Sequence, residues 1–111
     1  MLEMMKRFGQ VIKVRSDRLA EYKELHARVW PEVLDMISKC HIKNYSIFHR
    51  DGFLFAYFEY HGDDFEADMA IMSADPMTQK WWDVCMPCQE PLETCSEGEW
   101  WTNMEEVFHC H

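Results

Sequence analysis

Residues 42–60 read IKNYSIFHRDGFLFAYFEY, and this stretch decides the fold. Its two halves, 42–49 and 53–60, are rich in aromatic and β-branched residues, which predicts two strands. Arg50-Asp51-Gly52 joins them, and Asp-Gly between such runs is a strong hairpin signal. The second strand is apolar on both faces, whereas a sheet with one face in water would alternate apolar and polar residues. We therefore expect helices to cover one face and a second copy of the chain to cover the other.

The segment before this hairpin predicts a strand and a broken helix. Residues 7–14 form a short apolar run, which is typical of a strand. From Leu19 to Ile37, apolar residues recur every three or four positions, which indicates one helical stripe. Pro31 lacks a backbone N–H, so we expect the helix to kink or restart after Trp30.

The segment after the hairpin predicts two short helices and a final strand. The pattern is helical over 63–73 and 75–86, with a division at Asp75-Pro76, and the last strand is expected over 104–108. The order β-α-β-β-α-β predicts the α+β class, with the antiparallel sheet of a ferredoxin-like fold. We expect residues 1–111 to form a single domain, because no linker or repeat interrupts a chain of common domain length.

Composition argues against several functional classes. The net charge of −9 disfavours a surface for nucleic acid or anionic membranes, because such surfaces cluster Lys and Arg. No stretch reaches the roughly 20 apolar residues of a membrane span, and the first seven residues hold no run long enough for a signal peptide. The five cysteines, an odd number, fit reduced thiols better than a disulfide framework. We therefore expect a cytoplasmic protein, and a neutral small molecule stays open as its ligand.

One predicted helix face carries a candidate for acid–base chemistry. Tyr22, His26 and Trp30 lie four residues apart on that face. By spacing alone, His26 is a well-packed core or rim histidine. The neighbouring Tyr22 favours a catalytic role for His26, because imidazole titrates near neutrality and a tyrosine hydroxyl one turn away can orient a hydroxylated ligand.

Two pairs of adjacent tryptophans are candidate ligand contacts. Adjacent helical positions diverge by roughly 100°, so Trp81 and Trp82 are not expected to point into one small core. Indole rings stack on the apolar C–H faces of sugars, and their N–H groups donate to hydroxyls. A plain packing role for one of the two stays open. Trp100-Trp101, in a predicted loop, poses the same question.

The cysteines show no convincing metal or redox pattern. Cys85 and Cys88 have CxxC spacing, but a zinc site needs a second close pair or a Cys/His knuckle. A thioredoxin-type motif opens a helix, whereas this one follows a predicted helix. No glycine-rich phosphate loop and no Ser-His-Asp order is present in the sequence. We therefore expect neither a metal nor a cofactor.

Four blocks of sequence, in order, resemble the L-rhamnose mutarotase family. They are Tyr22-x3-His26-x3-Trp30-Pro31-Glu32, Asn44-Tyr45-Ser46-Ile47, Trp81-Trp82 and Glu105-Glu106-Val107-Phe108. The resemblance covers residues 7–109 and implies a ferredoxin-like homodimer of the dimeric α/β barrel type. It also implies an isomerase that interconverts the α and β anomers of a 6-deoxy-L-hexose without a cofactor. In that family His26 matches the catalytic acid, and the substrate-binding positions match Tyr22, Tyr45, Trp81 and Trp82.

Alternatives remain open on the sequence alone. The long aromatic segment between 85 and 101 leaves the sugar preference undecided, so L-fucose competes with L-rhamnose. The second proton relay is open between Tyr22, Tyr45 and water. Because ferredoxin-like dimers host many functions, a non-catalytic dimeric sugar-binding module is a rival, as are an oxygenase on the same scaffold and a metal-bound thiol protein.

Overall fold

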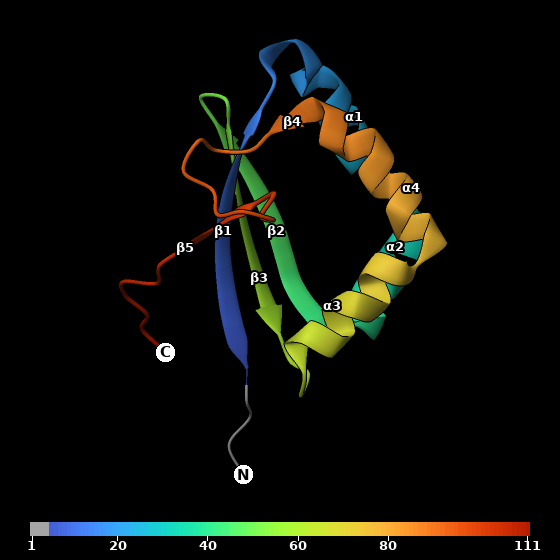
Figure 1. Cartoon of the computed structure of the whole chain (residues 1–111), viewed down its shortest axis with the longest axis vertical. Helices are drawn as coiled ribbons and strands as arrows, with labels where there is room; N and C mark the ends of the chain where they lie inside the picture. The colour runs from blue at the N-terminus through green and yellow to red at the C-terminus, as the bar shows by residue number, and fades with distance from the viewer. Residues whose placement is uncertain (1–4) are drawn as a thin grey trace.

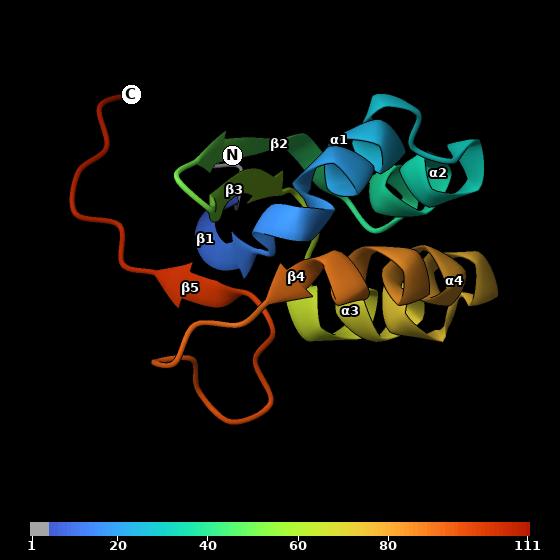
Figure 2. The same ribbon diagram turned by 90° about the horizontal axis from the view of Figure 1, so that it is seen from above.

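The computed structural model describes residues 5–111, and residues 1–4 of the predicted domain lie outside the described part. The elements are β1 (Lys6–Val14), the 3-10 turn η1 (Ser16–Arg18), α1 (Leu19–Ala27), α2 (Pro31–Lys39), β2 (Ile42–Arg50), β3 (Phe53–Tyr60), α3 (Phe65–Ala74), α4 (Pro76–Cys85), the 3-10 turn η2 (Met86–Cys88), β4 (Gln89–Glu90) and β5 (Thr102–Met104). The antiparallel sheet has the order β2-β3-β1-β4, which confirms the ferredoxin-like α+β fold. The helices lie on one side of it (Figures 1 and 2).

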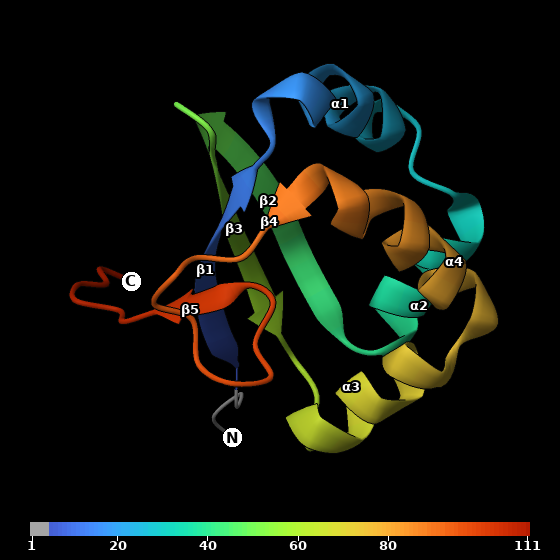
Figure 3. The same ribbon diagram turned by 45° about the horizontal axis from the view of Figure 1, so that its top comes forward.

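Prolines divide both helical segments, as predicted. α2 begins at Pro31, with Trp30 extended as its N-cap, and α4 begins at Pro76. A proline is well tolerated in the first helical turn, where its missing N–H would have no helical partner. The four helices follow the concave side of the curved sheet (Figure 3). Within residues 5–111, no helix is long and apolar enough to cross a membrane.

The hairpin of β2 and β3 forms as predicted and sets which residues face the helices. Asp51 and Gly52 have φ of 52° and 83°, which is the two-residue turn that Asp-Gly favours. The side chains of β3 that face the helices are at most 6% exposed, and they are Leu54, Ala56, Phe58 and Tyr60. The opposite face leaves Phe53 and Phe55 each 37% exposed.

The predicted last strand at 104–108 is wrong over most of its length. β5 covers Thr102–Met104, pairs with Gly9–Val11 of β1, and ends there. The chain then leaves the sheet as a tail without regular structure (Figure 1). A strand needs a neighbouring strand to bond with, and within residues 5–111 none pairs with the tail. Val107 and Phe108 are accordingly 86% and 80% exposed.

Two short strands share one edge of β1. β4 pairs with its Lys13–Val14 end, and β5 pairs further along it. Between them, residues 91–101 leave the sheet as a loop and return (Figure 3). This loop carries Trp100 and Trp101 back toward the side of the sheet that faces the helices.

Candidate active site

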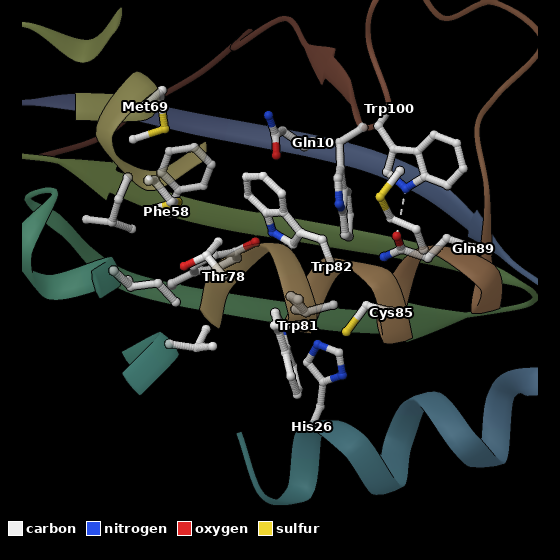
Figure 4. A pocket seen from close by; sticks show the side chains of 18 of the residues that line it. Gln10, His26, Phe58, Met69, Thr78, Trp81, Trp82, Cys85, Gln89 and Trp100 are labelled. Carbon is white, nitrogen blue, oxygen red and sulfur yellow. Dashed lines mark hydrogen bonds between the residues drawn. The ribbon is translucent and has the colours of Figure 1, made fainter. Parts of the chain in front are cut away.

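A cavity of about 420 Å³ lies between the sheet and the helices. The site residues predicted from the sequence all line it, namely Tyr22, His26, Tyr45, Trp81 and Trp82. The rest of its wall is mainly apolar and includes Val33, Ile37, Ile42, Phe58, Met69 and Met72. Figure 4 shows Phe58 and Met69 in this wall. A concave, mainly apolar site with a few convergent polar groups is the usual form of a small-molecule binding site.

The imidazole of His26 is held between two aromatic rings near the end of α1. Its ring stacks on that of Tyr22, with centroids 4.1 Å apart, and meets Trp81 edge-on at 5.1 Å. Its Nδ1 lies 2.9 Å from the backbone oxygen of Tyr22. A carbonyl oxygen only accepts hydrogen bonds, so Nδ1 must carry the hydrogen and donate it. Nε2 is therefore the nitrogen left to exchange a proton with a ligand.

The surroundings of His26 favour its neutral form. Desolvation lowers the pKa of His26 below 6.5, and the bond to the Tyr22 carbonyl only partly opposes this shift. At neutral pH, Nε2 thus presents a lone pair. His26 is half-buried and lies at the cavity wall, near Trp81 and Cys85 (Figure 4). A neutral, tautomerically fixed imidazole at a cavity wall is equipped to act as a general base.

A chain of hydrogen bonds ties Tyr22 to the loop at 91–101. Gln89 Nε2 lies 3.2 Å from Tyr22 Oη. Gln89 Oε1 accepts from Trp100 Nε1 at 2.7 Å, the bond drawn as a dashed line in Figure 4. Tyr22 and Gln89 are each only 4% exposed. Burial raises the pKa of the Tyr22 phenol far above its usual range, so the hydroxyl stays protonated at neutral pH.

A β-bulge places Tyr45 at the cavity. Lys43 pairs with Glu59 and Ser46 pairs with Tyr57, so Asn44 and Tyr45 together stand opposite one residue of β3. Asn44 has φ of 51°, a left-handed conformation that asparagine tolerates better than most residues. The ring of Tyr45 then lies 5.4 Å from that of Phe58, on the helix-facing side.

Both tryptophan pairs reach the cavity. Trp81 is 7% exposed and belongs to the core as well as to the cavity wall, while Trp82 is only partly buried. This difference in burial is consistent with the expectation that the two indoles point in different directions. Trp100 and Trp101 also line the cavity, so the loop at 91–101 helps to enclose it.

The cysteines of the CxxC pair are buried and free. Cys85 and Cys88 are 5% and 0% exposed, and desolvation raises the pKa of the Cys85 thiol to about 12. A thiol that stays protonated is a poor nucleophile and a poor metal ligand. Across residues 5–111, no group of three or more His, Cys, Asp or Glu side chains is arranged to hold a metal ion.

Three polar residues at the cavity were missed by the sequence reasoning. Gln10 faces the helices because it alternates in phase with the apolar Phe8 and Ile12. This alternation is visible in the sequence and could have identified Gln10. Thr78 also lines the cavity, but its hydroxyl donates to Asp75 at 2.8 Å. Gln89 gave no signal, because it lies in a strand of two residues.

A model of the L-rhamnose mutarotase family matches residues 7–110. The chain belongs to this family. An L-rhamnose mutarotase of Lactiplantibacillus plantarum is 35% identical over 107 residues, which cover 95% of this chain and 98% of the relative. One of Phocaeicola vulgatus is 40% identical over 91 residues, which cover 80% of this chain and 83% of the relative.

Solved structures agree with this family membership in fold. The L-rhamnose mutarotase of Formosa agariphila superposes with a TM-score of 0.74 at 24% identity, covering 96% of this chain and 99% of that one. The tetracenomycin F2 cyclase of Streptomyces glaucescens superposes with a TM-score of 0.67 at 12% identity, covering 96% of each chain. At such identities the likeness shows the fold alone, and a mutarotase and a polyketide cyclase share it.

Proposed function

We propose that the protein is an L-rhamnose mutarotase, an isomerase that interconverts the α and β anomers of this 6-deoxy-L-hexose by ring opening and reclosure. One observation carries the proposal. In a chain of this family, a single cavity gathers His26, two tyrosines and paired tryptophans, with Nε2 of His26 left to exchange a proton. The tryptophans offer apolar faces and N–H donors, which suits a neutral sugar.

The proposed mechanism moves two protons. Nε2 of neutral His26 takes the proton of the anomeric hydroxyl while the bond from C1 to the ring oxygen breaks and C1 becomes an aldehyde. The ring oxygen takes a proton from a hydroxyl donor in the cavity. After rotation about C1–C2, the ring oxygen attacks the other face of C1. The imidazolium then returns its proton to the new anomeric hydroxyl, and the donor recovers its own. His26 thus acts as base on opening and as acid on closure.

A polarimetric experiment tests this function and the choice of sugar. Freshly dissolved L-rhamnose of one anomer is expected to reach its equilibrium rotation faster with the protein than in buffer. L-fucose, also a 6-deoxy-L-hexose, is the competing substrate, and the D-enantiomers of both sugars serve as controls. Sugar binding without any acceleration would favour a non-catalytic binding module instead.

The pH dependence should reflect a lowered His26 pKa. Since Nε2 must be neutral to accept the first proton, kcat/KM is expected to be level above pH 7 and to fall as acid protonates the ring. The midpoint should lie below 6.5, because desolvation lowers the pKa of the free enzyme's imidazole. Initial rates, corrected for buffer at each pH, measure the profile. A rate that rises on acidification would mean that the imidazolium is the form needed first.

We also propose that the protein is a homodimer formed through the sheet face that the helices leave uncovered. Phe48, Phe53 and Phe55 lie on this face, with exposed fractions of 65%, 37% and 37%. An exposed apolar patch of this kind is typical of an interface between proteins. Val107 and Phe108, exposed in the tail, add further apolar surface for a partner chain.

The dimer proposal predicts the effect of a charge on that face. The unchanged protein should show twice the mass of one chain in light scattering after size exclusion. Phe55→Lys should shift it to monomer at micromolar concentration, because the new charge would be buried without a partner. Leu34→Lys is the matched control, since Leu34 is 51% exposed on α2, in the helix layer. Equal masses for both variants would contradict the assignment.

A cytoplasmic location completes the proposal. The cysteines at 40, 85, 88, 95 and 110 are all free in the structure, which suits a reducing compartment. Detection of the protein in a soluble cell fraction with reduced thiols would test this.

A further inference from the structure

Gln89 joins the cavity to the loop at 91–101 through two hydrogen bonds whose direction the chemistry fixes. An indole N–H can only donate, so Trp100 requires an acceptor, which must be the amide oxygen of Gln89. The amide nitrogen of Gln89 therefore faces Tyr22 and donates to its hydroxyl oxygen. Trp100 in this way removes the usual ambiguity about which end of a glutamine amide is which.

The same direction settles where the Tyr22 hydrogen can go. Because the phenol oxygen accepts from Gln89, its own hydrogen must point elsewhere, and the residues described give it no acceptor. Tyr22 lines the cavity beside His26, whose ring stacks on it with centroids 4.1 Å apart. The hydrogen is thus available to a ligand in the cavity.

We propose that Gln89 is a positioning residue, which turns the Tyr22 hydroxyl hydrogen toward the substrate and makes Tyr22 the donor to the ring oxygen. This inference rests on the proposed mutarotase function. Tyr22 gives its proton to the ring oxygen as the C1–oxygen bond breaks, while His26 takes the anomeric proton. On closure, the ring oxygen returns a proton to Tyr22 and His26 returns one to the anomeric oxygen, so protons balance.

The backbone holds Gln89 in place for this role. It pairs with Val14 of β1 in the register of β4, and it is 4% exposed. Both polar atoms of its side-chain amide are hydrogen-bonded, the nitrogen to Tyr22 and the oxygen to Trp100. Through Trp100 and Gln89, the loop at 91–101 thereby sets the direction of the Tyr22 hydroxyl hydrogen in the cavity.

Three variants separate this role from plain packing. Gln89→Met keeps similar bulk but cannot donate, so kcat should fall about tenfold with KM within about twofold, as for a group acting in the transition state. In Gln89→Glu, the carboxylate still accepts from Trp100, but it also accepts from Tyr22 and draws the hydroxyl hydrogen away. That variant should lose more, about 100-fold in kcat, the order of a missing acid–base partner. Trp100→Phe should lower kcat about threefold, because the amide of Gln89 then loses the donor that orients it.

A double-mutant cycle with Tyr22→Phe gives the decisive readout. If Gln89 acts through Tyr22, the losses of all three variants should vanish in the Tyr22→Phe background, whereas independent effects would multiply. The control is Glu90→Gln, the reverse exchange at the next residue, whose side chain bonds outward to Lys13 and Arg15; it should leave kcat unchanged. Losses that persist undiminished without the Tyr22 hydroxyl, or an unchanged kcat in Gln89→Glu, would overturn the proposal.

A second measurement does not depend on turnover. The indole N–H resonance of Trp100, assigned in ¹H–¹⁵N spectra by its loss in Trp100→Phe, should move upfield in Gln89→Met because its acceptor is gone. No movement would show that the bond is absent in solution, which overturns the positioning role whatever the activity. By contrast, if the protein without substitutions did not accelerate anomer exchange of any 6-deoxy-L-hexose, the proposed mutarotase function itself would be wrong.

Discussion

Replacement of His26 by asparagine is expected to remove most of the catalysed anomer exchange. The asparagine amide can still donate to the Tyr22 carbonyl in place of Nδ1, so the end of α1 keeps its bond. Nothing then stands in for Nε2, which takes and returns the proton in the proposed mechanism. Since general acid–base groups typically contribute about 10²–10⁴-fold, we expect kcat to fall by at least about 100-fold.

The matched control for this variant is His109→Asn, the same exchange at an exposed position in the tail. It should keep the full rate. Sugar binding by His26→Asn, measured by quenching of tryptophan fluorescence, should remain, because the two tyrosines and the tryptophans still line the cavity. A His26→Asn protein that is folded and retains full acceleration would show that another group moves the proton.

Gly62→Ala is expected to destabilise the fold strongly. A methyl group at Gly62 would overlap the Tyr60 hydroxyl and come within 2.7 Å of Asp68 Oδ2. These atoms have little room to move, because Tyr60 is 2% exposed and its hydroxyl donates to Asp68 while accepting from the Asp64 N–H. Overpacking of this kind costs about 3 kcal/mol, which should lower the melting temperature by about 10 °C or more.

Gly9→Ala is the control for that substitution. Its added carbon would meet only the terminal methyl of Met104, at 3.4 Å, and a flexible side chain can yield. Thermal unfolding followed by circular dichroism should therefore give nearly the melting temperature of the unchanged protein. If Gly62→Ala also melted at that temperature, the packing of Tyr60 against Gly62 would be looser than the structure shows.

The fold was predictable because its decisive signals are local. Asp51-Gly52 specifies a two-residue turn by its backbone preferences, and Pro31 and Pro76 each specify the start of a helix. The strand expected at 104–108 forms only as far as Met104, because strand formation depends on a neighbouring strand. That neighbour is a property of the assembled sheet, which a local pattern does not contain.

The site was predictable in part for the same reason. Tyr22 and His26 share a helix face by spacing, so their stacking follows from helical geometry. The position of Tyr45 depends on a bulge, and only the left-handed tolerance of Asn44 hints at it. Gln89 follows Tyr22 by 67 residues in the chain, and it reaches Tyr22 because β4 pairs with β1, which no spacing rule reveals.

The central claim is that this protein exchanges the anomers of a 6-deoxy-L-hexose. Saturation-transfer NMR on L-rhamnose at equilibrium tests it most directly, because it observes exchange without any coupled reaction. Saturation of the anomeric proton of one form should diminish that of the other when the protein is present at micromolar concentration, and not in buffer alone. Transfer no greater than in buffer, with L-rhamnose and with L-fucose, would contradict the claim.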